Sequence, residues 1–78
     1  MSDYRLEFGS SITPNDTDRL YQILPIVSKD DELEIIIQDK NSKEVGSIID
    51  VLKSNEFDVS AIEHKDRRRL YLLVHRNS

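Results

Sequence analysis

Residues 69–75 form a mostly apolar segment that predicts a strand with Leu70, Leu72 and Val74 on one face and Tyr71, Leu73 and His75 on the other. In two further segments, residues 4–8 and 57–61, apolar and polar residues alternate with a period of two. This period is typical of β-strands that are buried on one face only. A fourth segment, residues 33–38, carries three consecutive isoleucines, which predicts burial at least partly on both faces and a central position in a sheet. We therefore expect four strands.

The segment after the first strand predicts a helix with a defined start and end. Thr13 is a good N-cap, and Pro14 suits the first helical position because its missing N–H would have no partner there. Apolar residues then follow at helical spacing. Pro25 removes a backbone hydrogen bond and clashes with the preceding turn, so we expect the helix to end near Leu24.

A second helix is predicted between the second and third strands. Asn41 or Ser42 is the expected N-cap, and Glu44 stands three residues after Asn41, as in a capping box. Asn55 is the expected C-cap. Between them the apolar residues form a single stripe at helical spacing, Val45, Ile48, Ile49 and Leu52.

The order of these elements, βαβαββ, predicts a two-layer α/β (α+β) sandwich in which a four-stranded mixed sheet carries two helices on one face. Helical crossovers make the first two strands parallel, and a final hairpin with its loop at residues 64–68 adds an antiparallel pair. Each helix has one apolar stripe, so the two can cover only one face of the sheet. Residues 1–78 are expected to form one domain; the strand order stays open.

Composition narrows the chemistry that the chain can perform. Its 78 residues include no cysteine, which excludes disulfides, thiolate metal sites and a thiol nucleophile. No apolar run approaches the ~20 residues that a membrane span needs, and the first residues lack the pattern of a signal peptide. We expect a soluble, cytoplasmic protein with no membrane association, no cofactor and no metal site.

Several segments along the whole chain resemble the TusA/SirA-like sulfur-carrier domains. That family has the same length and element order, and a Cys-Pro-x-Pro motif that opens the first helix after a strand ending in an acidic residue and a glycine. The corresponding segments here are Glu7-Phe8-Gly9, Thr13-Pro14-Asn15-Asp16 and residues 31–39, 56–59 and 70–76. The resemblance implies the sandwich predicted above.

Thr13 stands where the family has its cysteine, Pro14 aligns with the first proline of the motif, and Asp16 replaces the second. Members of the family carry sulfur as a persulfide on that cysteine, which a threonine hydroxyl cannot form. The two histidines lie far along the chain, so no base is expected beside Thr13. We therefore expect no catalytic residue and no enzyme activity, chemistry at Thr13 being the one enzymatic alternative.

The resemblance then implies a non-catalytic protein-interaction or regulatory module. Two surfaces could serve it: the start of the first helix and the sheet face that the helices leave open. Their candidate residues are Gly9, Thr13, Pro14, Asn15 and Asp16 at the helix start, and Ile36, Tyr71 and Leu73 on the open face. The occupant would be an unidentified protein partner, or a second copy of the chain in a homodimer through the open face.

An RNA-binding module is the alternative, because the same shape also resembles the C-terminal RNA-binding domain of a bacterial translation initiation factor. Its candidate contacts are the basic residues of the C-terminal hairpin, Lys65, Arg67, Arg69 and Arg76. The net charge of −4 weighs against this alternative, since binding to nucleic acid depends on neutralising phosphates.

Overall fold

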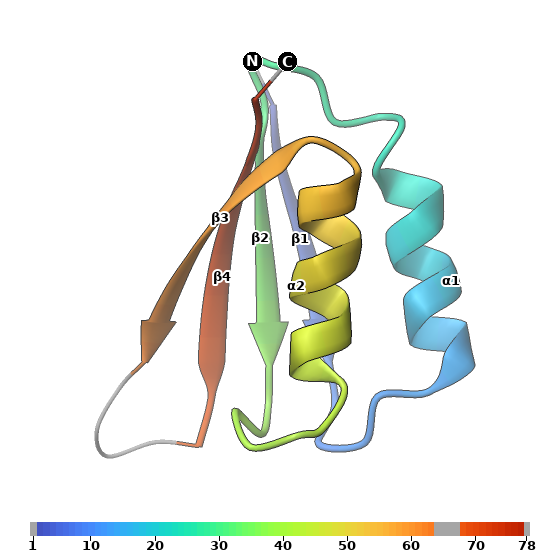
Figure 1. Cartoon of the computed structure of the whole chain (residues 1–78), viewed down its shortest axis with the longest axis vertical. Helices are drawn as coiled ribbons and strands as arrows, with labels where there is room; N and C mark the ends of the chain where they lie inside the picture. Colours follow the sequence, from blue (N-terminus) through green and yellow to red (C-terminus); the bar gives the residue numbers. More distant parts are fainter. Residues whose placement is uncertain (1, 64–67, 78) are drawn as a thin grey trace.

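The computed structural model of the chain describes residues 2–63 and 68–77, and its elements follow the predicted order βαβαββ (Figure 1). They are β1 (Asp3–Phe8), α1 (Pro14–Ile23), β2 (Glu32–Ile37), α2 (Val45–Ser54), β3 (Phe57–Glu63) and β4 (Leu70–Arg76). Most of the loop predicted between the last two strands lies outside the described residues. Within the described part of the chain, neither helix is long and apolar enough to cross a membrane.

The four strands form one mixed sheet in the order β1-β2-β4-β3. β1 and β2 are parallel, as the helical crossover between them requires, whereas β4 is antiparallel to both β2 and β3. β4 is therefore inserted between β2 and β3. The mixed sheet that the sequence predicts is confirmed, and β2 occupies the expected central position.

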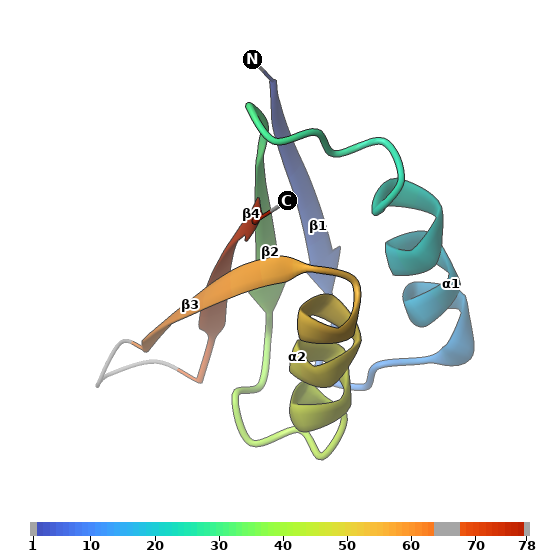
Figure 2. The same ribbon diagram turned by 45° about the horizontal axis from the view of Figure 1, so that its top comes forward.

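Both helices lie on the same face of the sheet (Figure 2). The core fills the space between the two layers, and its centre is formed by Leu33, Ile35 and Ile37 of β2, all 0% exposed. Ile36 lies between them in sequence and therefore points to the opposite face. The two-layer sandwich with helices on one face is thus the observed architecture.

The boundaries of α1 agree with the prediction, whereas α2 begins later than predicted. α1 ends at Ile23, with Leu24 as its C-cap immediately before Pro25. α2 begins at Val45 with Glu44 as its N-cap, so the capping role predicted for Asn41 or Ser42 is wrong.

The start of α2 is delayed by a turn around Asp39. The Asp39 carboxylate accepts a hydrogen bond from the Asn41 backbone N–H at 3.0 Å, which turns the chain before the helix begins. The Ser42 hydroxyl donates to Glu44 Oε2 at 2.7 Å, and this bond lowers the pKa of the Glu44 carboxyl. At the other end Asn55 is the C-cap, as predicted, and Glu56 takes a left-handed φ of 67° that leads into β3.

β3 runs two residues beyond the predicted end at Ala61. Its register with β4 continues without a bulge to the pair Glu63–Leu70, although the side chains of the last residues are exposed. Backbone pairing rather than burial therefore extends this strand. The extension adds Ile62 to the sheet.

Arg76 connects the end of β4 to the end of α1. Its Nε donates to the Val27 carbonyl and its Nη2 to the Leu24 carbonyl, both at 2.8 Å. The guanidinium also lies 4.6 Å from the centre of the Phe57 ring. A cation placed on the last carbonyls of a helix complements the helix dipole, so this half-buried arginine holds α1 against the sheet.

We expect Arg76→Ala to lower the free energy of unfolding by about 2 kcal/mol, because two charge-assisted hydrogen bonds and a cation–π contact are lost. Arg76→Lys should recover less than half, since an ammonium cannot reproduce the planar fork. Denaturant titration measures both values. The control is Arg69→Ala, which removes one 3.2 Å bond from an exposed arginine to half-buried Gln38 and should cost under about 0.5 kcal/mol. Equal losses at the two positions would contradict the anchoring role.

Candidate functional site

The start of α1 is a closed set of local hydrogen bonds. The Thr13 backbone N–H and hydroxyl both donate to Asp16 Oδ2, at 2.9 and 3.1 Å, and the Asp16 backbone N–H donates back to the Thr13 hydroxyl at 3.4 Å. This is a capping box in which an aspartate replaces the usual glutamate. Gly9, Pro14 and Asn15 are exposed around it.

The structure corrects the expectation that no base lies beside Thr13. The Asp16 carboxylate is in hydrogen-bond contact with the hydroxyl, but it also accepts from the Thr13 backbone N–H and from Arg19 at 3.3 Å. A carboxylate held in this way acts as the helix cap. It also occupies the position at the helix N-terminus where an external anion would otherwise bind.

We expect Thr13→Ala to lower the free energy of unfolding by about 1 kcal/mol through loss of the cap. Thr17→Ala is the matched control, because the Thr17 hydroxyl donates only to the Pro14 carbonyl within the same helix turn. Alanine has the higher helix propensity, so this change should stay within about 0.5 kcal/mol of zero. Thermal or denaturant unfolding distinguishes the two, and an equal loss from both would be inconsistent with the capping role.

The other predicted residues, Ile36, Tyr71 and Leu73, lie together on the open face of the sheet. Ile36 of β2 lies opposite Tyr71 of β4, and Tyr71 lies opposite Ile62 of β3. Leu73 is two positions along β4 from Tyr71 and therefore on the same face. We call Ile36, Ile62, Tyr71 and Leu73 the open-face cluster; it forms an apolar strip across three strands.

Ile62 is the member of this cluster that the sequence analysis missed. Its side chain is 42% exposed, whereas Ile36 at the other end of the strip is only 8% exposed. The alternation of residues 57–61 contained the necessary signal, because one further step places Ile62 on the face opposite Ala61. Because the strand was predicted to end at Ala61, Ile62 was not assigned to it.

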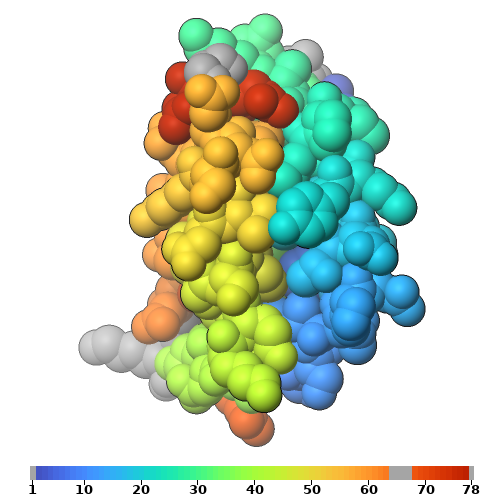
Figure 3. Space-filling view, turned by 45° about the vertical axis from the view of Figure 1, so that its right-hand side comes forward, coloured from blue at the N-terminus to red at the C-terminus, as the bar shows by residue number. Residues whose placement is uncertain are grey.

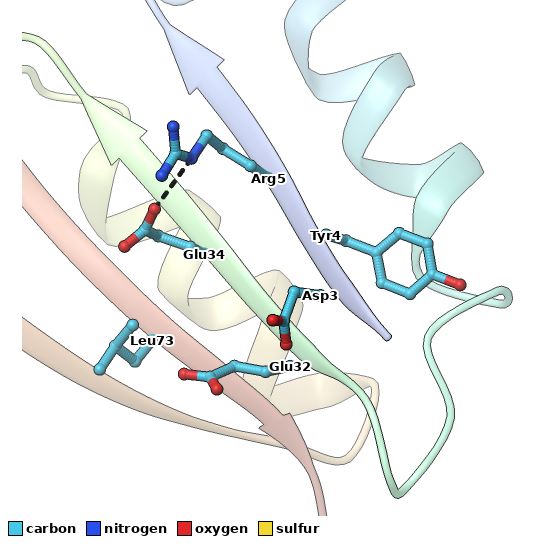
Figure 4. Close-up of a pocket in the computed structure, with 6 residues that line it drawn as sticks. All are labelled: Asp3, Tyr4, Arg5, Glu32, Glu34 and Leu73. Atoms are coloured by element: carbon cyan, nitrogen blue, oxygen red, sulfur yellow. Dashed lines mark hydrogen bonds and ion pairs between the residues drawn. The ribbon is translucent and has the colours of Figure 1, made fainter. Parts of the chain in front are cut away.

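A concavity of about 400 Å³ lies beside the open-face cluster, at the end of the sheet where β1 and β2 begin (Figure 4). Leu73 lines it and belongs to both features. Three carboxylates, Asp3, Glu32 and Glu34, surround it, and Arg5 donates from Nε to Glu34 Oε1 at 3.0 Å. The concavity is thus predominantly acidic with an apolar contact.

The helix side of the molecule has a smaller concavity than the open face. Figure 3 shows α1 and α2 side by side along this side, and a groove of about 220 Å³ runs between them. Leu20 and Ile48 form part of its lining and are each 1% exposed, so they offer almost no apolar surface to a partner there. Ile26, just beyond α1, is exposed without belonging to this groove.

Asp31 is the one charged side chain buried in the described part of the chain. It accepts hydrogen bonds from the Ser28 backbone N–H and hydroxyl, both at 2.9 Å, and from the Ser2 backbone N–H at 2.8 Å. The Ser28 backbone N–H is the main cause that lowers the pKa of Asp31. The group therefore stays ionised and fastens the turn before β2, a structural task rather than acid–base chemistry.

We expect Asp31→Asn to reduce stability at neutral pH and to change its pH dependence. The folded-state pKa is below the unfolded one, so the stabilisation is present above about pH 4 and is lost as the pH falls through the folded-state pKa. Unfolding curves of the wild type and the variant should therefore converge in acid. Asp30→Asn, at the exposed neighbouring residue, is the control; a constant difference across all pH values would refute this role of Asp31.

Of the basic residues considered for RNA binding, the structure describes Arg69 and Arg76, and these two lie on opposite faces of the sheet. Arg69 lies just before β4 on the open face, with its Nε donating to Gln38 Oε1. Arg76 ends the same strand on the helix face, where the end of α1 engages its guanidinium. Lys65 and Arg67 lie outside the described residues.

Within residues 2–63 and 68–77, no three histidine, aspartate or glutamate side chains are grouped so that they could hold a metal ion. Comparisons of the chain with protein-family models, curated proteins and solved structures found no match.

Proposed function

We propose that this protein is a TusA/SirA-like domain that works as a non-catalytic protein-interaction module, without persulfide transfer, and that it binds a protein partner through its open sheet face. The observation that carries the proposal is the open-face cluster, an apolar strip across β2, β4 and β3 on the face that neither helix covers.

The composition of the strip supports a protein interface. Burial of apolar surface yields about 25 cal/mol per Å², so covering exposed Ile62 together with its half-buried neighbours would favour association. Tyrosine is enriched at protein interfaces, and Tyr71 stands at the centre of the strip between Ile36 and Ile62. Contiguous exposed apolar surface commonly marks an interaction site.

The start of α1 supports the non-catalytic part of the proposal. A threonine hydroxyl carries no sulfur, and the Thr13 hydroxyl is engaged in the capping box with Asp16. The βαβαββ order and the one-sided helical layer agree with the resemblance noted from the sequence.

Site-specific photo-crosslinking in the native cell tests the proposal. A crosslinking residue at position 62 should give a discrete protein adduct, whereas one at position 26 should not. Position 26 is the matched control because Ile26 is the same residue type and is more exposed, at 59%, but lies on the helix side. The purified partner should then bind the domain, and Ile62→Ser should weaken that binding at least about ten-fold, the loss expected for a buried interface side chain.

Ile26→Ser should leave the affinity unchanged. The proposal fails if positions 62 and 26 give the same adducts, if neither gives one, or if the two serine variants lose affinity equally. Amide spectra of both variants establish that each retains the fold before the affinities are compared.

A further inference from the structure

The open face is acidic around its apolar strip. Strand alternation and the pairing registers place Asp3, Glu7, Glu32, Glu34 and Asp58 on it, together with Arg5 and Arg69. These described residues comprise five carboxylates and two guanidinium groups, a net charge of −3. An apolar centre with a negative surround favours a partner of the opposite sign.

Two of these carboxylates are placed against each other. Asp3 and Glu32 are direct partners in the parallel pairing of β1 and β2, and like charges in that position destabilise a sheet. The nearby Arg5 is engaged by Glu34 instead (Figure 4). Among the ion pairs between described residues, none involves Asp3 or Glu32.

The acidic pair lies next to the apolar strip. Asp3 and Glu32 line the concavity of about 400 Å³ to which Leu73 of the open-face cluster also contributes. Ile36 lies four positions beyond Glu32 along β2, a distance of about 13 Å at ~3.3 Å per residue. A bound segment could therefore contact both features at once, with a basic residue about 13 Å from its apolar anchors.

Resting on the proposed function, we propose that the partner presents a cationic amphipathic segment to this face. Its apolar side chains cover the open-face cluster, and a lysine or arginine enters the acidic concavity beside Asp3 and Glu32. A second copy of this chain does not fit, because its own open face would bring the same negative charge against these carboxylates. The negative charge of the open face thus favours a basic protein partner over the homodimer.

A titration of the ¹⁵N-labelled protein with two designed peptides tests this inference. Both are amphipathic helices of about 20 residues with the same leucine face; one carries lysines about seven and eight residues, or about 11–12 Å, from its central leucine on the same side of the helix, and the other carries glutamates there. The lysine peptide should shift the amide signals of β1, β2 and β4 on the open face. At low salt it should bind about ten-fold more tightly than the glutamate peptide, and this ratio should shrink in ~0.5 M salt because the charges are partly exposed.

The double variant Asp3→Asn with Glu32→Gln should lose most of the preference for lysine, and its fold should persist because a like-charge contact is removed. The matched control neutralises two exposed helix carboxylates, Asp18→Asn with Asp50→Asn, and changes the net charge equally. If this control also loses most of the preference for the lysine peptide, the preference comes from the net charge of the protein rather than from Asp3 and Glu32. The inference is then overturned.

The outcomes separate the inference from the proposed function. Equal binding of both peptides at the open face would overturn the cationic partner and leave the interaction module in place. An absence of shifts at the open face with either peptide would overturn both. Light scattering tests whether a second copy of the chain is the partner. The protein should be monomeric at the titration concentration. A dimer that Ile62→Ser dissociates would overturn the choice against a second copy.

Discussion

The burial of β2 is the constraint on which the rest of the structure depends. This strand is paired on both edges and presents Leu33, Ile35 and Ile37, all fully buried, to the helix layer. The described part of the chain supplies two helices for this task, and each has one apolar stripe. Both helices are needed on the face where β2 places these side chains, so the other face has no helical cover.

The chemistry of the uncovered face follows from that division. Its charged residues are those expected of a solvated surface, but the open-face cluster interrupts them with an apolar strip that crosses three strands. Ile36 is nearly buried by its neighbours on this face, and exposure increases toward Ile62 on the edge strand β3. The apolar surface available for binding is therefore greatest at the edge strand β3.

The predictions that succeeded depend on residues close together in the sequence. A capping box spans only the three residues from Thr13 to Asp16, and the effect of Pro25 reaches no further than the preceding turn. The N-cap of α2 was wrong for an equally local reason, because Asp39 competes for the backbone N–H of Asn41. Several adjacent side chains there could form the turn, and the sequence alone does not rank them.

The sequence by itself determined the type and order of the elements, the two layers and the start and end of α1, since periodicity and capping act over a few residues. Only the tertiary structure decided the strand order, the position of Ile62 beside Tyr71, the pairing of Asp3 with Glu32 and the engagement of Arg76 by α1. These arrangements arise from register and packing between residues distant along the chain, and no local preference specifies which pairing buries β2 best.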